Sequence, residues 1–147
     1  MRDQGRNPRI AMSERLAPPL AGGLPPSEWR GVRVGQLAIR PYSADGSDVV
    51  RVEAVVHLGR LTPADVYVSL EPGEPGPIAE DGRWPLRMHS TRCFRNGRYV
   101  FEALIRSPFP RPSSVVAVRV RPSDGDRWAL PPQPVVRSFS WREAGGA

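Results

Sequence analysis

The sequence predicts an all-β fold, an immunoglobulin-like antiparallel β-sandwich of about seven strands with an extended N-terminal arm. Three observations support this prediction. Apolar residues alternate with polar or mixed residues through residues 49–58 and again through 66–71, which is the period of a strand with one buried face. Turn formers are abundant, with 18 prolines and 14 glycines among 147 residues. No segment spaces its apolar residues as a helix would over three turns.

Seven segments have strand character, and turn residues separate them. The expected strands are residues 32–40, 49–58, 66–71, 84–92, 98–105, 115–121 and 135–141. Between two of them, Asn96 and Gly97 predict a hairpin turn, because both residues tolerate the positive φ angles of such turns. The proline-rich residues 71–83 predict a long exposed loop, and residues 107–114 predict an irregular segment that cannot be a central strand.

The same alternation predicts which side chains face inward and form a single core. Its expected members are Val52, Ala54, Val56, Leu58, Val66, Val68, Leu70, Leu86, Met88, Tyr99, Phe101, Val116, Val118 and Val120. Six further aromatic residues either cap the core or present exposed rings, and capping is the favoured interpretation. These are Trp29, Trp84, Trp128, Trp141, Tyr42 and Tyr67.

Residues 1–28 are expected to form an extended or disordered arm, and residues 29–147 the sandwich domain. The arm is rich in arginine and proline and has no usable apolar period, so alone it cannot offset its ordering entropy. We assign it a partner-binding role, in which arginines contact carboxylates or lipid phosphates and regularly spaced leucines fill shallow pockets. The candidate partner-binding residues are Arg2, Arg6, Arg9, Arg15, Leu16, Leu20 and Leu24.

Charge and composition exclude several classes of protein. The chain has 21 basic and 15 acidic residues, a net charge of +6, and every basic residue is an arginine. The arginines are scattered among acids, which indicates a solvated surface, so nucleic acid is not an expected partner. Cys93 is the single cysteine, and no apolar run reaches the ~18 residues of a membrane span. We expect a cytoplasmic protein that meets membranes only through a partner.

Catalytic and cofactor chemistry is not expected either. The absence of lysine excludes a phosphate-binding P-loop and lysine-based acid–base roles. His57 and His89 are the only histidines, and zinc would need four ligands with close paired spacing. His89 and Cys93 would share one face of a strand, but without a pocket to hold a substrate. We therefore assign no catalytic residue, no metal ligand and no cofactor.

One passage resembles a known family. Residues 57–70, His-Leu-Gly-Arg-Leu-Thr-Pro-Ala-Asp-Val-Tyr-Val-Ser-Leu, resemble a segment near the C-terminus of bacterial α-glucan phosphorylases of the maltodextrin type. Met88, residues 97–101, residues 118–122 and Trp141 follow in the same order as in that family. There the region is a sandwich appended to the catalytic domains. Catalysis in the family needs a lysine that binds pyridoxal phosphate, so the resemblance implies an accessory module without the catalytic domains.

Two functions fit these observations. The first is a non-catalytic accessory or scaffolding subunit that docks on a larger protein complex through its sandwich surface and its arm. That complex would lie in the cytoplasm or at the cytoplasmic face of a membrane. The alternative is an α-glucan-binding accessory module in which Tyr67 and Trp84 stack on sugar rings. An exposed ring such as Tyr67 is also expected to pair with neighbouring arginines.

Overall fold

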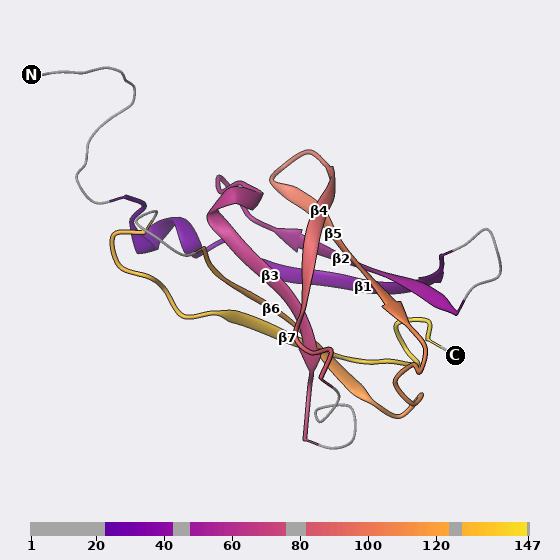
Figure 1. Cartoon of the computed structure of the whole chain (residues 1–147). Helices are drawn as coiled ribbons and strands as arrows, with labels where there is room; N and C mark the ends of the chain where they lie inside the picture. Colours follow the sequence, from indigo (N-terminus) through magenta and orange to yellow (C-terminus); the bar gives the residue numbers. More distant parts are fainter. Residues whose placement is uncertain (1–22, 43–47, 76–81, 124–127, 147) are drawn as a thin grey trace, which may run out of the picture.

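The computed structural model describes residues 23–42, 48–75, 82–123 and 128–146. This part of the chain forms seven β-strands and two short 3₁₀ helices (Figure 1). The strands are β1 (Arg33–Pro41), β2 (Val49–His57), β3 (Val66–Pro72), β4 (Leu86–Cys93), β5 (Arg98–Arg106), β6 (Val115–Pro122) and β7 (Val135–Ser140); the helices are η1 (Pro26–Trp29) and η2 (Pro63–Asp65). No helix in the described ranges is long and apolar enough to cross a membrane.

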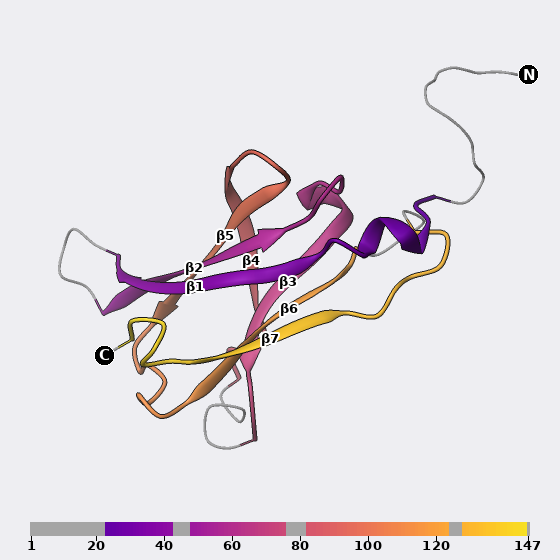
Figure 2. The ribbon, with the colours of Figure 1, turned by 180° about the vertical axis from the view of Figure 1, so that it is seen from behind.

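The strands lie in the order β1-β2-β5-β4-β3-β6-β7, and all neighbouring pairs are antiparallel. β4 changes partner along its length: Leu86 to Met88 pair with β3, and His89 to Cys93 pair with β5. The register shifts within the second pairing, and such a bulge bends and twists a strand. β1, β2 and β5 therefore form one layer, and β3, β6 and β7 form the other (Figures 1 and 2). The predicted all-β sandwich is confirmed, with its two layers joined through β4.

The two ends of the sheet, β1 and β7, approach each other (Figure 2). Arg137 Nη1 on β7 donates hydrogen bonds to the carbonyl oxygens of Val34, at 3.1 Å, and Gly35, at 2.6 Å. The N–H of Ile39 on β1 donates to the carbonyl oxygen of Ala144 at 2.8 Å. These bonds satisfy backbone groups at an edge that would otherwise offer a template for another strand. The sandwich is therefore nearly closed.

The core lies between the two layers and has the predicted membership. Every expected core residue is buried except Leu86 and Tyr99, which are partly buried against the same cluster. Trp29 and Trp128 pack edge to face, with ring centroids 5.3 Å apart, and Trp141 is 1% exposed. The capping interpretation is therefore confirmed for these three tryptophans.

Turns and strand ends follow local chemistry. Asn96 and Gly97 have φ angles of 66° and 73°, which confirms the predicted hairpin turn. In η2, a capping box joins Thr62 and Asp65, and the Thr62 N–H donates to Asp65 Oδ2 at 2.8 Å. β4 begins two residues later than expected, because Pro85 has no N–H to contribute to the ladder. Residues 107–114 carry no strand, as predicted.

The described residues also include the last part of the predicted arm. Leu24 forms a parallel bridge with Trp128, and the N–H of Ala129 donates to the Leu24 carbonyl oxygen at 2.9 Å. Its half-buried side chain packs against the core. Residues 23–28 thus contact the sandwich itself, while residues 1–22 lie outside the described ranges.

Candidate functional site

The predicted site residues fall in three places. Arg2, Arg6, Arg9, Arg15, Leu16 and Leu20 lie outside the described residues, and their partner-binding role stays a prediction. Leu24 packs on the domain's own core. Tyr67 is on the outer surface of β3, and Trp84 lies just before β4, where it lines a hollow together with the last residues of β3. The outer surface around β3 is therefore the candidate site.

Strand register assembles this surface. Buried Val66, Val68 and Leu70 face the core, so the alternate residues of β3 point to the opposite side. Tyr67 pairs with Arg121 of β6, while Ser69 pairs with Arg119 of β6 and with Arg87 of β4. We name this surface the Tyr67 face, and its members are Tyr67, Ser69, Glu71, Arg87, Arg119 and Arg121.

The ring of Tyr67 is flanked by two guanidinium groups from the neighbouring strands. The guanidinium carbon of Arg121 lies 4.3 Å from the ring centroid, and that of Arg87 lies 4.7 Å away. Both distances are within the ~6 Å range of cation–π attraction, so the expected pairing of this ring with arginines is confirmed. Neither arginine forms an ion pair with any described residue. Among the described residues, no carboxylate therefore competes for their N–H donors.

The third arginine of the face is neutralised. Arg119 Nε donates to Glu71 Oε1 at 3.0 Å, and Ser69 Oγ donates to Glu71 Oε2 at 3.2 Å. These contacts fix the Glu71 carboxylate beside its own strand. A half-exposed pair of this kind contributes at most about 1 kcal/mol to stability. The net positive charge of the Tyr67 face therefore comes from Arg87 and Arg121.

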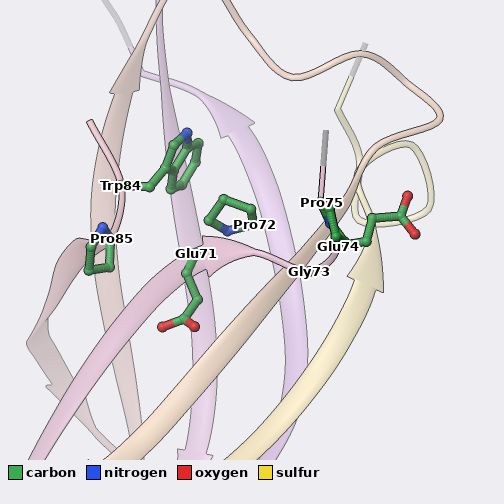
Figure 3. Close-up of a pocket in the computed structure, with 7 residues that line it drawn as sticks. All are labelled: Glu71, Pro72, Gly73, Glu74, Pro75, Trp84 and Pro85. Carbon is green, nitrogen blue, oxygen red and sulfur yellow. The ribbon is translucent and has the colours of Figure 1, made fainter. Parts of the chain in front are cut away.

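A hollow of about 530 Å³ adjoins this face at the end of β3 (Figure 3). Its lining consists of Glu71, Pro72, Gly73, Glu74, Pro75, Trp84 and Pro85. In Figure 3 the indole of Trp84 lies beside Pro72, and the carboxylates of Glu71 and Glu74 point away from the indole. The hollow is thus open and mainly apolar near its aromatic ring.

Arg83 holds the segment that leads to this hollow. Its guanidinium group lies 5.9 Å from the Trp84 ring centroid. Arg83 Nη1 donates to the carbonyl oxygen of Arg106, and Nη2 donates to that of Pro108 at 2.8 Å. This arginine therefore fixes Trp84 against the end of β5.

The geometry distinguishes the two expected functions. A sugar platform needs an aromatic ring with a free face and polar groups that converge on the bound sugar. The ring of Tyr67 is occupied by arginines, and the carboxylates next to Trp84 point away from it. Two guanidinium groups that stack on an aromatic ring, with no ion-pair partner in the described part of the chain, instead match a surface that carries carboxylates.

In the sequence the arginines are scattered among acids, and for that reason the Tyr67 face was not predicted. The alternation of Arg119 and Arg121 around buried Val120 places both on one side of β6. This alternation is visible in the sequence and could have predicted that the two arginines share one face. The sequence does not predict which strands lie on either side of Tyr67, because strand pairing depends on the whole fold.

Other chemistry-bearing residues do not gather into a site. Cys93 is exposed, and its Sγ lies 3.6 Å from the carbonyl oxygen of Phe94. His89 is exposed on the same strand. Within the described ranges, no group of three or more His, Cys, Asp or Glu residues could hold a metal ion.

Comparison with known proteins returned no matching family model, no similar curated protein and no similar solved structure. The resemblance to α-glucan phosphorylases therefore stays a prediction.

Proposed function

We propose that this chain is a non-catalytic accessory subunit that docks on a larger protein assembly, through the Tyr67 face, against an acidic surface of its partner. The observation that carries the proposal is the flanking of Tyr67 by Arg87 and Arg121, neither of which has an ion-pair partner among the described residues. The assembly would lie in the cytoplasm or at the cytoplasmic face of a membrane complex. The N-terminal arm would add a second contact.

The Tyr67 face is suited to binding because its arginines would lose little conformational freedom on forming a complex. Holding a flexible side chain at an interface costs about 0.5–1.5 kcal/mol, and an arginine already stacked on a ring has lost part of that freedom before binding. Tyrosine and arginine are also enriched among the residues that dominate binding energy. Positive charge on the face would speed the encounter with an acidic partner.

The experiment is a comparative affinity purification. The tagged full-length chain is compared with the double variant Arg87→Glu/Arg121→Glu, which should recover at least tenfold less of the main partner. The matched control is Arg111→Glu/Arg142→Glu, the same charge change at two exposed arginines outside the face. Equal recovery by the two double variants would refute the assignment of the face.

A truncation tests the arm separately. Removing residues 1–22 leaves Leu24 and its bridge to Trp128 in place, so the sandwich keeps its described contacts. We expect a weaker complex with the same partner. Identical partners and identical affinity with and without residues 1–22 would contradict a role for the arm.

The hollow at Trp84 supports a second candidate function, the binding of an α-glucan. An exposed hollow of 530 Å³ with an indole in its wall has room for sugar rings. Electrophoresis in gels that contain glycogen tests this idea: retardation lost in Trp84→Ala, but kept in the Arg87→Glu/Arg121→Glu variant, would support it. Unretarded migration of the unmodified chain would exclude it.

A further inference from the structure

A second basic cluster lies on the other layer, at the end of β2. β1, β2 and β5 are neighbours, and their register places Arg33 opposite His57 and His57 opposite Arg98. Val34 and Val56 are buried, so the alternate positions point outward, away from the core. Three basic side chains therefore stand in one row across three adjacent strands. We name this row the His57 row.

No carboxylate in the described chain balances the row. The acids on the same face of β2 and β5 are Glu53 and Glu102. Glu53 is engaged with Arg40 at 2.9 Å, Arg51 at 3.4 Å and Arg92 at 3.4 Å, and Glu102 Oε2 accepts a hydrogen bond from Thr91 Oγ1 at 2.8 Å. Arg33 and Arg98 form no ion pair with any described residue. Like charges on adjacent strands destabilise a sheet, so an anion bound between them would relieve that cost.

Local geometry keeps the row accessible. A side chain at Gly35 would place its Cβ 3.2 Å from His57 Nε2, so the glycine leaves that nitrogen uncrowded. The guanidinium group of Arg98 lies 5.8 Å from the ring centroid of Phe94, whose side chain is 42% exposed. Phe94 thus limits the freedom of Arg98 without covering it.

The environment of His57 lowers the pKa of its imidazole. Partial burial, and then the charges of Arg33 and Arg98, hold the pKa of His57 below its ordinary value of 6.5. On the β7 side, Arg137 adds a further cation, bound to the carbonyl oxygen of Gly35. The imidazole is therefore mainly neutral near pH 7, with one N–H to donate and one nitrogen able to accept a proton.

We propose that the His57 row binds a phosphate dianion, either inorganic phosphate or the terminal phosphate of a small phosphorylated molecule. The two guanidinium groups match the charge of the dianion, and each of the three side chains can donate to a separate phosphate oxygen. A carboxylate would bring one charge and two oxygens, and so would leave one donor unused. Binding places negative charge beside the imidazole and therefore favours its protonated form.

Nuclear magnetic resonance of the full chain tests this, because His57 and His89 are its only histidines. The pKa of each imidazole is measured by titration in four solutions of the same ionic strength, which contain chloride, inorganic phosphate, glycerol phosphate or acetate. Either phosphate probe should raise the pKa of His57 by about one unit, a tenfold change in proton affinity, and leave His89 unchanged. Which of the two probes acts distinguishes inorganic phosphate from a phosphorylated molecule.

Variants complete the test. Arg33→Gln/Arg98→Gln should weaken phosphate binding at least tenfold, while the control Arg142→Gln should not. Gly35→Ala keeps every charge but crowds Nε2, and it should also weaken binding, which provides a second test if the double variant fails to fold. Four results would overturn the proposal: no shift of His57, equal shifts of both histidines, an equal effect of acetate, or unchanged phosphate affinity in a folded variant of the row.

Discussion

Replacing Gly97 with alanine tests whether the β4–β5 hairpin packs on the loop that follows β2. Gly97 has a φ angle of +73°, and the N–H of Leu58 donates to its carbonyl oxygen at 2.7 Å. A Cβ atom at this position would overlap the carbonyl oxygen of Gly59, which is backbone and cannot rotate away. The substitution therefore combines an unfavourable backbone conformation with a steric clash.

Alanine substitutions at two other glycines, Gly59 and Gly31, separate the conformational cost from the steric clash. Gly59 has a φ angle of +62° with no atom within 4 Å of an added Cβ, so Gly59→Ala should cost only the left-handed conformation, about 1–2 kcal/mol. In Gly97→Ala the clash also displaces the hydrogen bond from Leu58, which adds about 1–3 kcal/mol for an unsatisfied N–H. Gly31 has neither problem, so Gly31→Ala should be neutral or gain up to about 1 kcal/mol.

Urea unfolding followed by tryptophan fluorescence measures the three free energies of unfolding. The expected order of destabilisation is Gly97→Ala, then Gly59→Ala, then Gly31→Ala. For a domain of this size each kcal/mol corresponds to a melting temperature change of about 4 °C, so thermal unfolding gives an independent ranking. If Gly97→Ala is no more destabilising than Gly59→Ala, the hairpin does not sit against Gly59 and the described packing is wrong.

Three further predictions concern buried and charged groups. Trp128→Phe removes the hydrogen bond from Nε1 to the Asp65 carbonyl oxygen at 3.0 Å and should cost about 1 kcal/mol in urea unfolding; unchanged stability would contradict it. Because the pKa of His57 is lowered in the folded chain, the unfolded chain binds the proton first, and stability should fall as pH drops below 6.5. His57→Gln should remove that part of the pH dependence, and an identical profile between pH 5 and 7.5 would argue against it. Glu53→Gln breaks three ion pairs, two with exposed arginines and one with the half-buried Arg51, so it should cost about 1 kcal/mol or less and reduce the sensitivity of stability to salt, whereas unchanged salt sensitivity would count against those pairs.

The alternation of apolar residues was sufficient to predict the strands, because each strand has one face against the core and one outside. Val52, Val56 and Leu70 are fully buried, as their period indicates. The hairpin turn at Asn96 and Gly97 was equally predictable, since few residues accept positive φ angles. These features depend on local chemistry alone.

Features that depend on strand pairing could not be predicted. Tyr67, Arg87 and Arg121 are distant in the sequence, and only the neighbouring positions of β4, β3 and β6 bring them together. The same holds for the row of Arg33, His57 and Arg98. The change of partner within β4 also depends on tertiary packing, because its residues give no local sign of where one pairing ends.

We propose that this chain acts through its Tyr67 face. Arginine footprinting with phenylglyoxal, read by mass spectrometry on the purified complex and on the free chain, tests it most directly. We expect Arg87 and Arg121 to lose reactivity in the complex while Arg111 and Arg142 keep theirs. Unchanged reactivity of Arg87 and Arg121 in a stable complex would contradict it.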